Sequence, residues 1–221
     1  PGMKERDDKV LLHHMVGSFE SQHKLFEHIT CANTVLRDPE RAGYEIDRVL
    51  TAAQEHKQPV YIELPRDMVD RPIKYDAFSQ LTPKEAKTDQ TSLEESIAEV
   101  VEWLKVAKNP VIWAGVECAR YDVAKKLIKF AEQTNIPVAT TILGKSVVNE
   151  RHPLSLGVYC ESTSTEELKR YMESCDCLIM LGVMMTDMNT GFLPLKYQKR
   201  HIVRATSKEL QVKSHSYPDV K

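Results

Sequence analysis

Short apolar runs alternate with amphipathic stretches along most of this 221-residue chain. In its first third, residues 31–36 and 59–65 have the apolar character of buried strands. Between them, apolar side chains recur at three- and four-residue spacing, which predicts a helix that begins at Asp38-Pro39. The expected inward stripe of this helix consists of Ala42, Ile46, Val49, Leu50 and Ala53. Strand, helix and strand in this order predict a parallel crossover unit.

The same alternation returns after residue 90. Helices are predicted at residues 91–107, 121–135 and 164–174, and strands at 110–115, 136–141, 177–182 and 201–205. Thr91 or Ser92 is expected to cap the first helix, and Ser164 with Glu167 has the spacing of a capping box for the third. The first helix is expected to bury Leu93, Ile97, Val100, Val101, Leu104 and Ala107. This alternation predicts the α/β class, with a doubly wound parallel sheet.

The two alternating parts are separated by a stretch of different character. Residues 67–90 contain Pro72, Pro83 and many charges, with little apolar periodicity. We interpret residues 71–90 as a linker, which leaves one predicted domain at residues 1–70 and another at residues 91–221.

Composition narrows the possible partners. Lys and Arg total 30 against 32 Asp and Glu, so no charge excess indicates a nucleic acid or an anionic membrane surface. No apolar run is long enough to span a bilayer. Five cysteines at irregular spacing argue against a disulfide framework and favour a reducing compartment, the cytoplasm. Residues 1–8 resemble neither a signal peptide nor the natural start of a translated protein. We therefore expect that the chain was cut from a longer protein or that its N terminus was processed.

The candidate catalytic residues are His13 and His14. They follow the apolar pair Leu11-Leu12 and precede Gly17, which predicts a strand end that runs into a turn. The carboxyl ends of strands in open α/β sheets are where ligands bind, and imidazoles exchange protons near neutral pH. A solvated strand end or loop without catalytic function is the competing interpretation.

Three other motifs have weaker support. Cys175-Asp176-Cys177 could suggest a metal or redox pair, but Cys177 begins an apolar run and is expected to be a core residue. Gly144-Lys145-Ser146 resembles the end of a phosphate-binding loop, yet Ala139 stands where its first glycine is required. The polar loop after Gly182 is expected to contact a neighbouring domain.

Several segments together resemble the thiamine-diphosphate-dependent 2-oxo acid decarboxylases, which include pyruvate, indolepyruvate and branched-chain 2-oxo acid decarboxylases. In the first domain these are Leu11 to His14 with Gly17, residues 45–50, residues 59–65, Asp67 and Val69. In the second they are residues 154–159, 176–183, 186–187 and 190–192, which resemble the central domain of that family. The segments occur in the family's order over nearly the whole chain.

The resemblance implies an internal fragment of such an enzyme, inactive alone. Residues 1–70 would be the C-terminal part of an incomplete α/β pyrimidine-binding domain, and residues 91–221 most of the central domain. His13 and His14 would orient the substrate carboxylate and handle protons during aldehyde formation. The full-length enzyme would use thiamine diphosphate and Mg²⁺, with neither bound to this fragment, and would assemble as a homodimer or homotetramer. Its substrate would be a small 2-oxo acid.

Two alternatives stay open at this point. One is a free-standing α/β module that binds a nucleotide or has a regulatory role, against which the missing glycine-rich fingerprint counts. The other is a synthase or lyase of the same superfamily, against which the histidine pair counts.

Overall fold

The computed structural model describes residues 2–8, 17–73, 87–190 and 201–220. The chain forms two compact units, Pro1–Glu85 and Ala86–Lys221. The strand end predicted at Leu11-Leu12, together with His13 and His14, lies outside the described residues.

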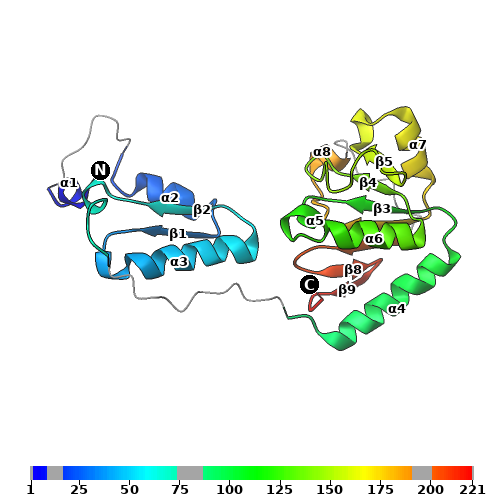
Figure 1. The fold of residues 1–221 in the computed structure, drawn as a ribbon, viewed down its shortest axis with the longest axis horizontal. Helices are drawn as coiled ribbons and strands as arrows, with labels where there is room; N and C mark the ends of the chain where they lie inside the picture. The colour runs from blue at the N-terminus through cyan, green and yellow to red at the C-terminus, as the bar shows by residue number, and fades with distance from the viewer. Residues whose placement is uncertain (1, 9–16, 74–86, 191–200, 221) are drawn as a thin grey trace. The chain divides into compact units, whose positions relative to one another are not determined.

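The first unit contains a two-stranded parallel sheet with a helix between its strands. In order it comprises α1 (Met3–Asp7), α2 (Ser21–Glu27), β1 (Ala32–Val35), α3 (Pro39–His56), β2 (Val60–Glu63) and the short 3-10 helix η1 (Arg66–Met68). Ala32 lies opposite Val60 and Val35 opposite Glu63 in the parallel register. In Figure 1, α3 runs beside both strands. The predicted strand–helix–strand crossover is confirmed.

Helix α3 begins as its sequence predicts. The carboxylate of Asp38 accepts the N–H of Glu40 at 3.0 Å, and proline occupies the first helical position. Ala42 and Val49 are buried as expected, but Leu50 is 47 % exposed, so its place in the inward stripe is wrong. Leu50 is exposed because the sheet of this unit has only two described strands. Such a sheet covers a narrower part of the helix surface than the sheets of four to six strands that are common in globular domains.

The second unit is built on a seven-stranded sheet. Its helices are α4 (Gln90–Val106), α5 (Glu117–Arg120), α6 (Ala124–Thr134), the 3-10 helix η2 (Glu161–Thr163), α7 (Glu166–Ser174) and α8 (Asp187–Thr190). Its strands are β3 (Pro110–Ala114), β4 (Val138–Thr140), β5 (Ser155–Val158), β6 (Cys177–Leu181), β7 (His201–Ala205), β8 (Leu210–Val212) and β9 (His215–Tyr217). The strand order is β5-β4-β3-β6-β7-β8-β9.

Helices cover both faces of this sheet, as the sequence predicts for a doubly wound fold. Along β3, Ile112 belongs to a core cluster that includes side chains of α4 and α6, whereas Trp113 belongs to a cluster that includes α7. Successive residues of a strand point to opposite faces, so these two clusters lie on opposite sides of the sheet. The α/β class is therefore confirmed, with five neighbouring parallel strands at its centre.

Three strands were not predicted from the sequence. β8 and β9 pair in antiparallel fashion at one edge, near the C terminus in Figure 1, and β5 pairs with β4 at the other edge. The sheet is therefore mainly parallel, with an antiparallel hairpin added at one edge. These strands are three or four residues long and contain polar residues or glycine, too few positions for a recognisable period.

The caps of two helices differ from prediction. Asp89 caps α4, since its carboxylate accepts the N–H of Ser92 at 2.8 Å, and Thr165 caps α7 by accepting the N–H of Leu168 at 3.3 Å. Ser164 instead accepts the N–H of Cys160. Neighbouring Asp, Ser and Thr residues are all competent caps, and the path of the incoming chain decides which one is used.

The inward face of α4 is also rotated from the predicted stripe. Ile97 and Val101 are 52 % and 41 % exposed, while Val100 and Leu104 pack against the core. Trp103, which was left out of the predicted stripe, packs there as well and stacks on His201 at 4.6 Å. Among the described residues, no helix combines the length and apolar character that crossing a bilayer requires.

Asp176 ties the end of α4 to the start of β6. Its carboxylate accepts the backbone N–H groups of Lys108 at 2.7 Å and Asn109 at 3.0 Å. Burial acts to raise the pKa of Asp176, but these N–H groups stabilise the charged form and bring the pKa below its usual value. The carboxylate therefore stabilises the fold mainly in its ionised form.

Replacing Asp176 by alanine is expected to lower the free energy of unfolding by about 2 kcal/mol at pH 7. Because the folded pKa lies below the unfolded one, this stabilisation is present above about pH 4 and is lost as pH falls through the folded pKa. Urea denaturation of the chain at pH 7 and pH 3 measures it. The control is Glu102→Ala, which removes an exposed ion pair with Lys105. An Asp176→Ala loss that is equally large at both pH values would contradict the assignment.

Candidate functional site

The histidine pair lies between two segments that the structure describes. Before it, α1 ends at Asp7, and after it Gly17 adopts φ of +80°, a conformation that favours glycine. The predicted turn at Gly17 is therefore present. His13 and His14 themselves lie outside the described residues. The described residues nearest to them along the chain are those of α1 and those that follow Gly17.

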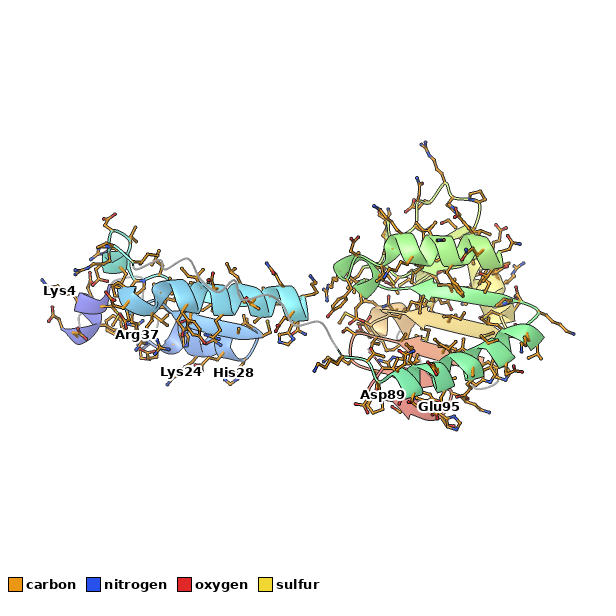
Figure 2. The ribbon with its side chains drawn as sticks, turned by 60° about the horizontal axis from the view of Figure 1, so that its bottom comes forward. Lys4, Lys24, His28, Arg37, Asp89 and Glu95 are labelled. Atoms are coloured by element: carbon orange, nitrogen blue, oxygen red, sulfur yellow. The ribbon has the colours of Figure 1, made fainter. Side chains whose placement is uncertain are left out.

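Four charged side chains gather at the carboxyl edge of the β1–β2 sheet, and we call them the Arg6 network: Arg6, Glu20, Arg37 and Glu63. The guanidinium of Arg6 pairs with Glu20 and, at 2.6 Å, with Glu63. Arg37 pairs with Glu20 at 3.0 Å. Figure 2 shows Arg37 toward the same end of this unit as Lys4 of α1. Ligands of open parallel sheets bind at this edge.

The Arg6 network is partly buried and charge-balanced. The side chain of Arg6 is 8 % exposed and that of Glu63 is 15 % exposed. The hydroxyl of Tyr61 donates to Glu63 at 3.3 Å, and burial followed by the Glu63 charge raises the pKa of Tyr61. The Tyr61 ring stacks on Phe26 at 4.1 Å between centroids. The Glu63 carboxylate thus accepts from two donors, Arg6 and Tyr61, an arrangement suited to positioning rather than to proton transfer.

The second unit contains a separate cavity at the carboxyl ends of β6 and β7. It has a volume of about 560 Å³ and a largely apolar wall that includes Cys118, Leu127 and Leu181. At its polar side, the Glu117 carboxylate accepts from the N–H and hydroxyl of Ser207 at 2.9 and 2.8 Å. Burial raises the pKa of the Cys118 thiol to about 11, so it stays protonated at neutral pH.

The glycines of the second unit have structural explanations. An added Cβ at Gly115 would lie 2.0 Å from the carbonyl oxygen of Gly182, and one at Gly144 would lie 2.7 Å from that of Ala114. Each glycine is needed because two backbone segments approach closely. The resemblance of residues 144–146 to a phosphate-binding loop therefore has no support in this geometry, and neither does a nucleotide site at Gly115.

The Cys175-Asp176-Cys177 motif belongs to the core. Cys177 is fully buried, and the carboxylate of Asp176 accepts the backbone N–H groups described above. In the described part of the chain, no group of three His, Cys, Asp or Glu side chains is arranged to hold a metal ion. The core interpretation of Cys177 is confirmed. The loop that follows Gly182 continues into residues 191–192, outside the described residues, and its contact with a neighbouring domain stays a prediction.

Sequence reasoning did not identify the Arg6 network. Its four members lie up to 57 positions apart in the sequence. Each of them alone has the character of an ordinary charged surface residue. Position along the chain is the only local signal: Arg37 directly follows the predicted strand at residues 31–36, and Glu63 lies near the end of the predicted strand at residues 59–65.

Comparison with known proteins supplies the family. Residues 97–221 match the family model described as thiamine pyrophosphate enzyme, central domain. The whole chain is 31 % identical to pyruvate decarboxylase isozyme 2 of Saccharomyces cerevisiae and 30 % identical to pyruvate decarboxylase of Kluyveromyces lactis. It is 31 % identical to indole-3-pyruvate decarboxylase of Azospirillum brasilense. The chain spans about 40 % of the length of each of these relatives. With more than half of its residues inside the matched model, the chain belongs to the thiamine pyrophosphate enzyme family and contains that family's central domain.

Proposed function

We propose that this chain is an internal part of a thiamine-diphosphate-dependent, non-oxidative 2-oxo acid decarboxylase that forms an aldehyde and carbon dioxide. One observation carries the proposal. The similarity to pyruvate and indole-3-pyruvate decarboxylases extends over the whole chain, including the part with His13 and His14 that precedes the matched central domain. A free-standing nucleotide-binding module is not favoured, because Gly115 and Gly144 are explained by backbone contacts.

The domain plan forms part of the proposal. Residues 1–70 belong to the pyrimidine-binding domain, residues 71–90 form the linker, and residues 91–221 form the central domain. The separation of compact units at Glu85 and Ala86 supports this plan, as does a family match that starts at residue 97. The parallel β1–β2 pair supports an α/β assignment for the first domain.

His13 and His14 are the proposed catalytic residues of this chain. Their imidazoles would bind and orient the substrate carboxylate and would hold or transfer protons at the carbon that becomes the aldehyde. Thiamine diphosphate, when bound to the complete enzyme, supplies the electron sink for loss of carbon dioxide. The turn at Gly17 and the Arg6 network at the carboxyl edge support a site at this end of the first unit.

We propose that thiamine diphosphate and Mg²⁺ bind to other parts of the complete enzyme, and we expect the isolated chain to bind neither. Within the described residues, no group of three His, Cys, Asp or Glu side chains is arranged to hold a metal ion, and the Asp176 carboxylate accepts backbone N–H groups.

A homodimer or homotetramer of the complete enzyme, in the cytoplasm, completes the proposal. Large apolar side chains of the first unit are strongly exposed, among them Leu25 at 67 % and Ile29 at 65 %, which supports burial against further protein. No disulfide joins the described cysteines, in keeping with a reducing compartment.

The test is aldehyde formation by the complete polypeptide that contains this chain. With thiamine diphosphate and Mg²⁺, we expect aldehyde from at least one of pyruvate, indolepyruvate or a branched-chain 2-oxo acid, measured by a coupled reductase assay. The isolated 221-residue chain under the same conditions is expected to form none. A complete polypeptide that releases no aldehyde from any of the three acids would contradict the proposal.

A further inference from the structure

The cavity of the second unit has the place and the size of a ligand-binding site. It lies at the carboxyl ends of β6 and β7, beside α5 and α6, and Figure 1 shows α6 alongside β3. β3 and β6 are neighbours in the sheet, and the chain continues from them toward opposite edges. Open α/β sheets bind ligands where the strand order reverses in this way. A volume of about 560 Å³ is within the range of pockets for small molecules.

Most of the cavity wall is apolar, so its ligand must be mainly apolar too. Leu127 and Leu181 line it from α6 and from the end of β6. Cys118 contributes an uncharged thiol, because burial in the first place, and the Glu117 charge in addition, raise its pKa to about 11. Hydrocarbon placed against this wall is removed from water, which favours binding.

One carboxylate interrupts the apolar wall. Glu117 accepts the N–H and the hydroxyl of Ser207 at 2.9 and 2.8 Å, which leaves acceptor positions of its two oxygens for a ligand. Both donors are uncharged, and in the part of the chain that the structure describes no lysine, arginine or histidine forms an ion pair with Glu117. A carboxylate beside an apolar wall favours a cation there and disfavours a phosphate or a second carboxylate.

Two aromatic rings at the same cavity also favour a cation. Tyr121, directly after α5, and Phe130 of α6 both line it, and they are 37 % and 36 % exposed. The faces of such rings attract ammonium groups. Lys126 lines the cavity as well, but its side chain is exposed, and lysines in such positions keep their ammonium group in water.

We propose that this cavity binds an apolar organic cation, an aromatic or alkyl amine whose ammonium group pairs with Glu117 and whose hydrocarbon part lies against Leu127 and Leu181. The inference goes beyond the proposed decarboxylase function and does not depend on it. Every residue that it uses lies in the second unit, and its test measures binding rather than aldehyde formation.

Isothermal titration of the complete polypeptide that contains this chain tests the proposal. The three probes share a phenyl ring and differ in charge: 2-phenylethylamine is a cation at neutral pH, 2-phenylethanol is neutral and 3-phenylpropionate is an anion. We expect the amine to bind about 10-fold more tightly than the alcohol, and the anion about 10-fold more weakly than the alcohol. Glu117→Gln is expected to weaken amine binding about 10-fold and to change alcohol binding by less than about 2-fold.

The matched control is Glu132→Gln, which removes one carboxylate from α6 where that side chain contacts His152, and it is expected to leave all three affinities unchanged. Ala205→Leu fills the cavity from β7 without a change of charge, and it is expected to weaken the amine and the alcohol about 10-fold each. It also locates the site should Glu117→Gln fail to fold, since binding elsewhere in the polypeptide would persist. Absence of amine binding, tightest binding of 3-phenylpropionate, or amine binding that survives either cavity variant overturns the proposal.

Discussion

Replacing both His13 and His14 by alanine is expected to lower kcat for decarboxylation by the complete enzyme by about 100-fold to 10,000-fold. This range is the usual contribution of positioned acid–base groups, and the two imidazoles are the proposed proton-transfer groups of this chain. The measurement is steady-state aldehyde formation with saturating thiamine diphosphate and Mg²⁺, for the double variant and for each single variant. The single variants show whether one imidazole transfers protons and the other orients the substrate.

The control for this experiment is His28→Ala. His28 follows α2 on the surface of the same unit, where Figure 2 labels it, and its substitution is expected to leave kcat within about 2-fold. Circular dichroism confirms that all variants fold. A double variant that retains the activity of His28→Ala would show that the pair is a solvated strand end, the competing interpretation.

Gly115→Ala is expected to lower the free energy of unfolding of the second unit by about 3 to 4 kcal/mol. The added Cβ would meet the Gly182 carbonyl oxygen at 2.0 Å and the Val183 Cα at 2.5 Å, and both belong to backbone that cannot move like a flexible side chain. The N–H of Gly115 also donates to the carbonyl oxygen of Leu181. Moving the backbone at Gly115 to relieve the clash would therefore break a hydrogen bond between the ends of β3 and β6. Thermal unfolding of the chain measures the loss, as a fall in Tm of about 10 °C.

Gly157→Ala is the matched control, because it separates backbone strain from steric contact. Gly157 has φ of +91°, yet an added Cβ there would meet nothing within 4 Å. It is expected to cost about 1 kcal/mol through conformation alone. Equal losses in the two variants would mean that the close approach of β3 and the β6 end does not explain Gly115.

Long, strongly periodic segments could be predicted from the sequence because their signal is local. Asp38 and Pro39 mark the start of α3 whatever surrounds them, and the apolar run of β3 identifies a strand buried on both faces. The alternation of such elements predicts the α/β class. His13 and His14 are adjacent residues, so their pairing is visible in the sequence, and their catalytic role stays a prediction.

Features that depend on a partner elsewhere in the chain were decided by the tertiary structure. The hairpin of β8 and β9 pairs with the edge of β7, and two three-residue segments are too short to reveal that pairing in the sequence. Leu50 and Ile97 fit an apolar stripe, but the sheet beside each helix covers a different strip of its surface. The Arg6 network joins α1, the start of α2 and the strand ends, and only folding brings these charges within bonding distance. The sequence by itself thus determined the elements and the fold class, because helix and strand periods are local, whereas the structure decided edges, caps and ion pairs, because those require a second segment in space.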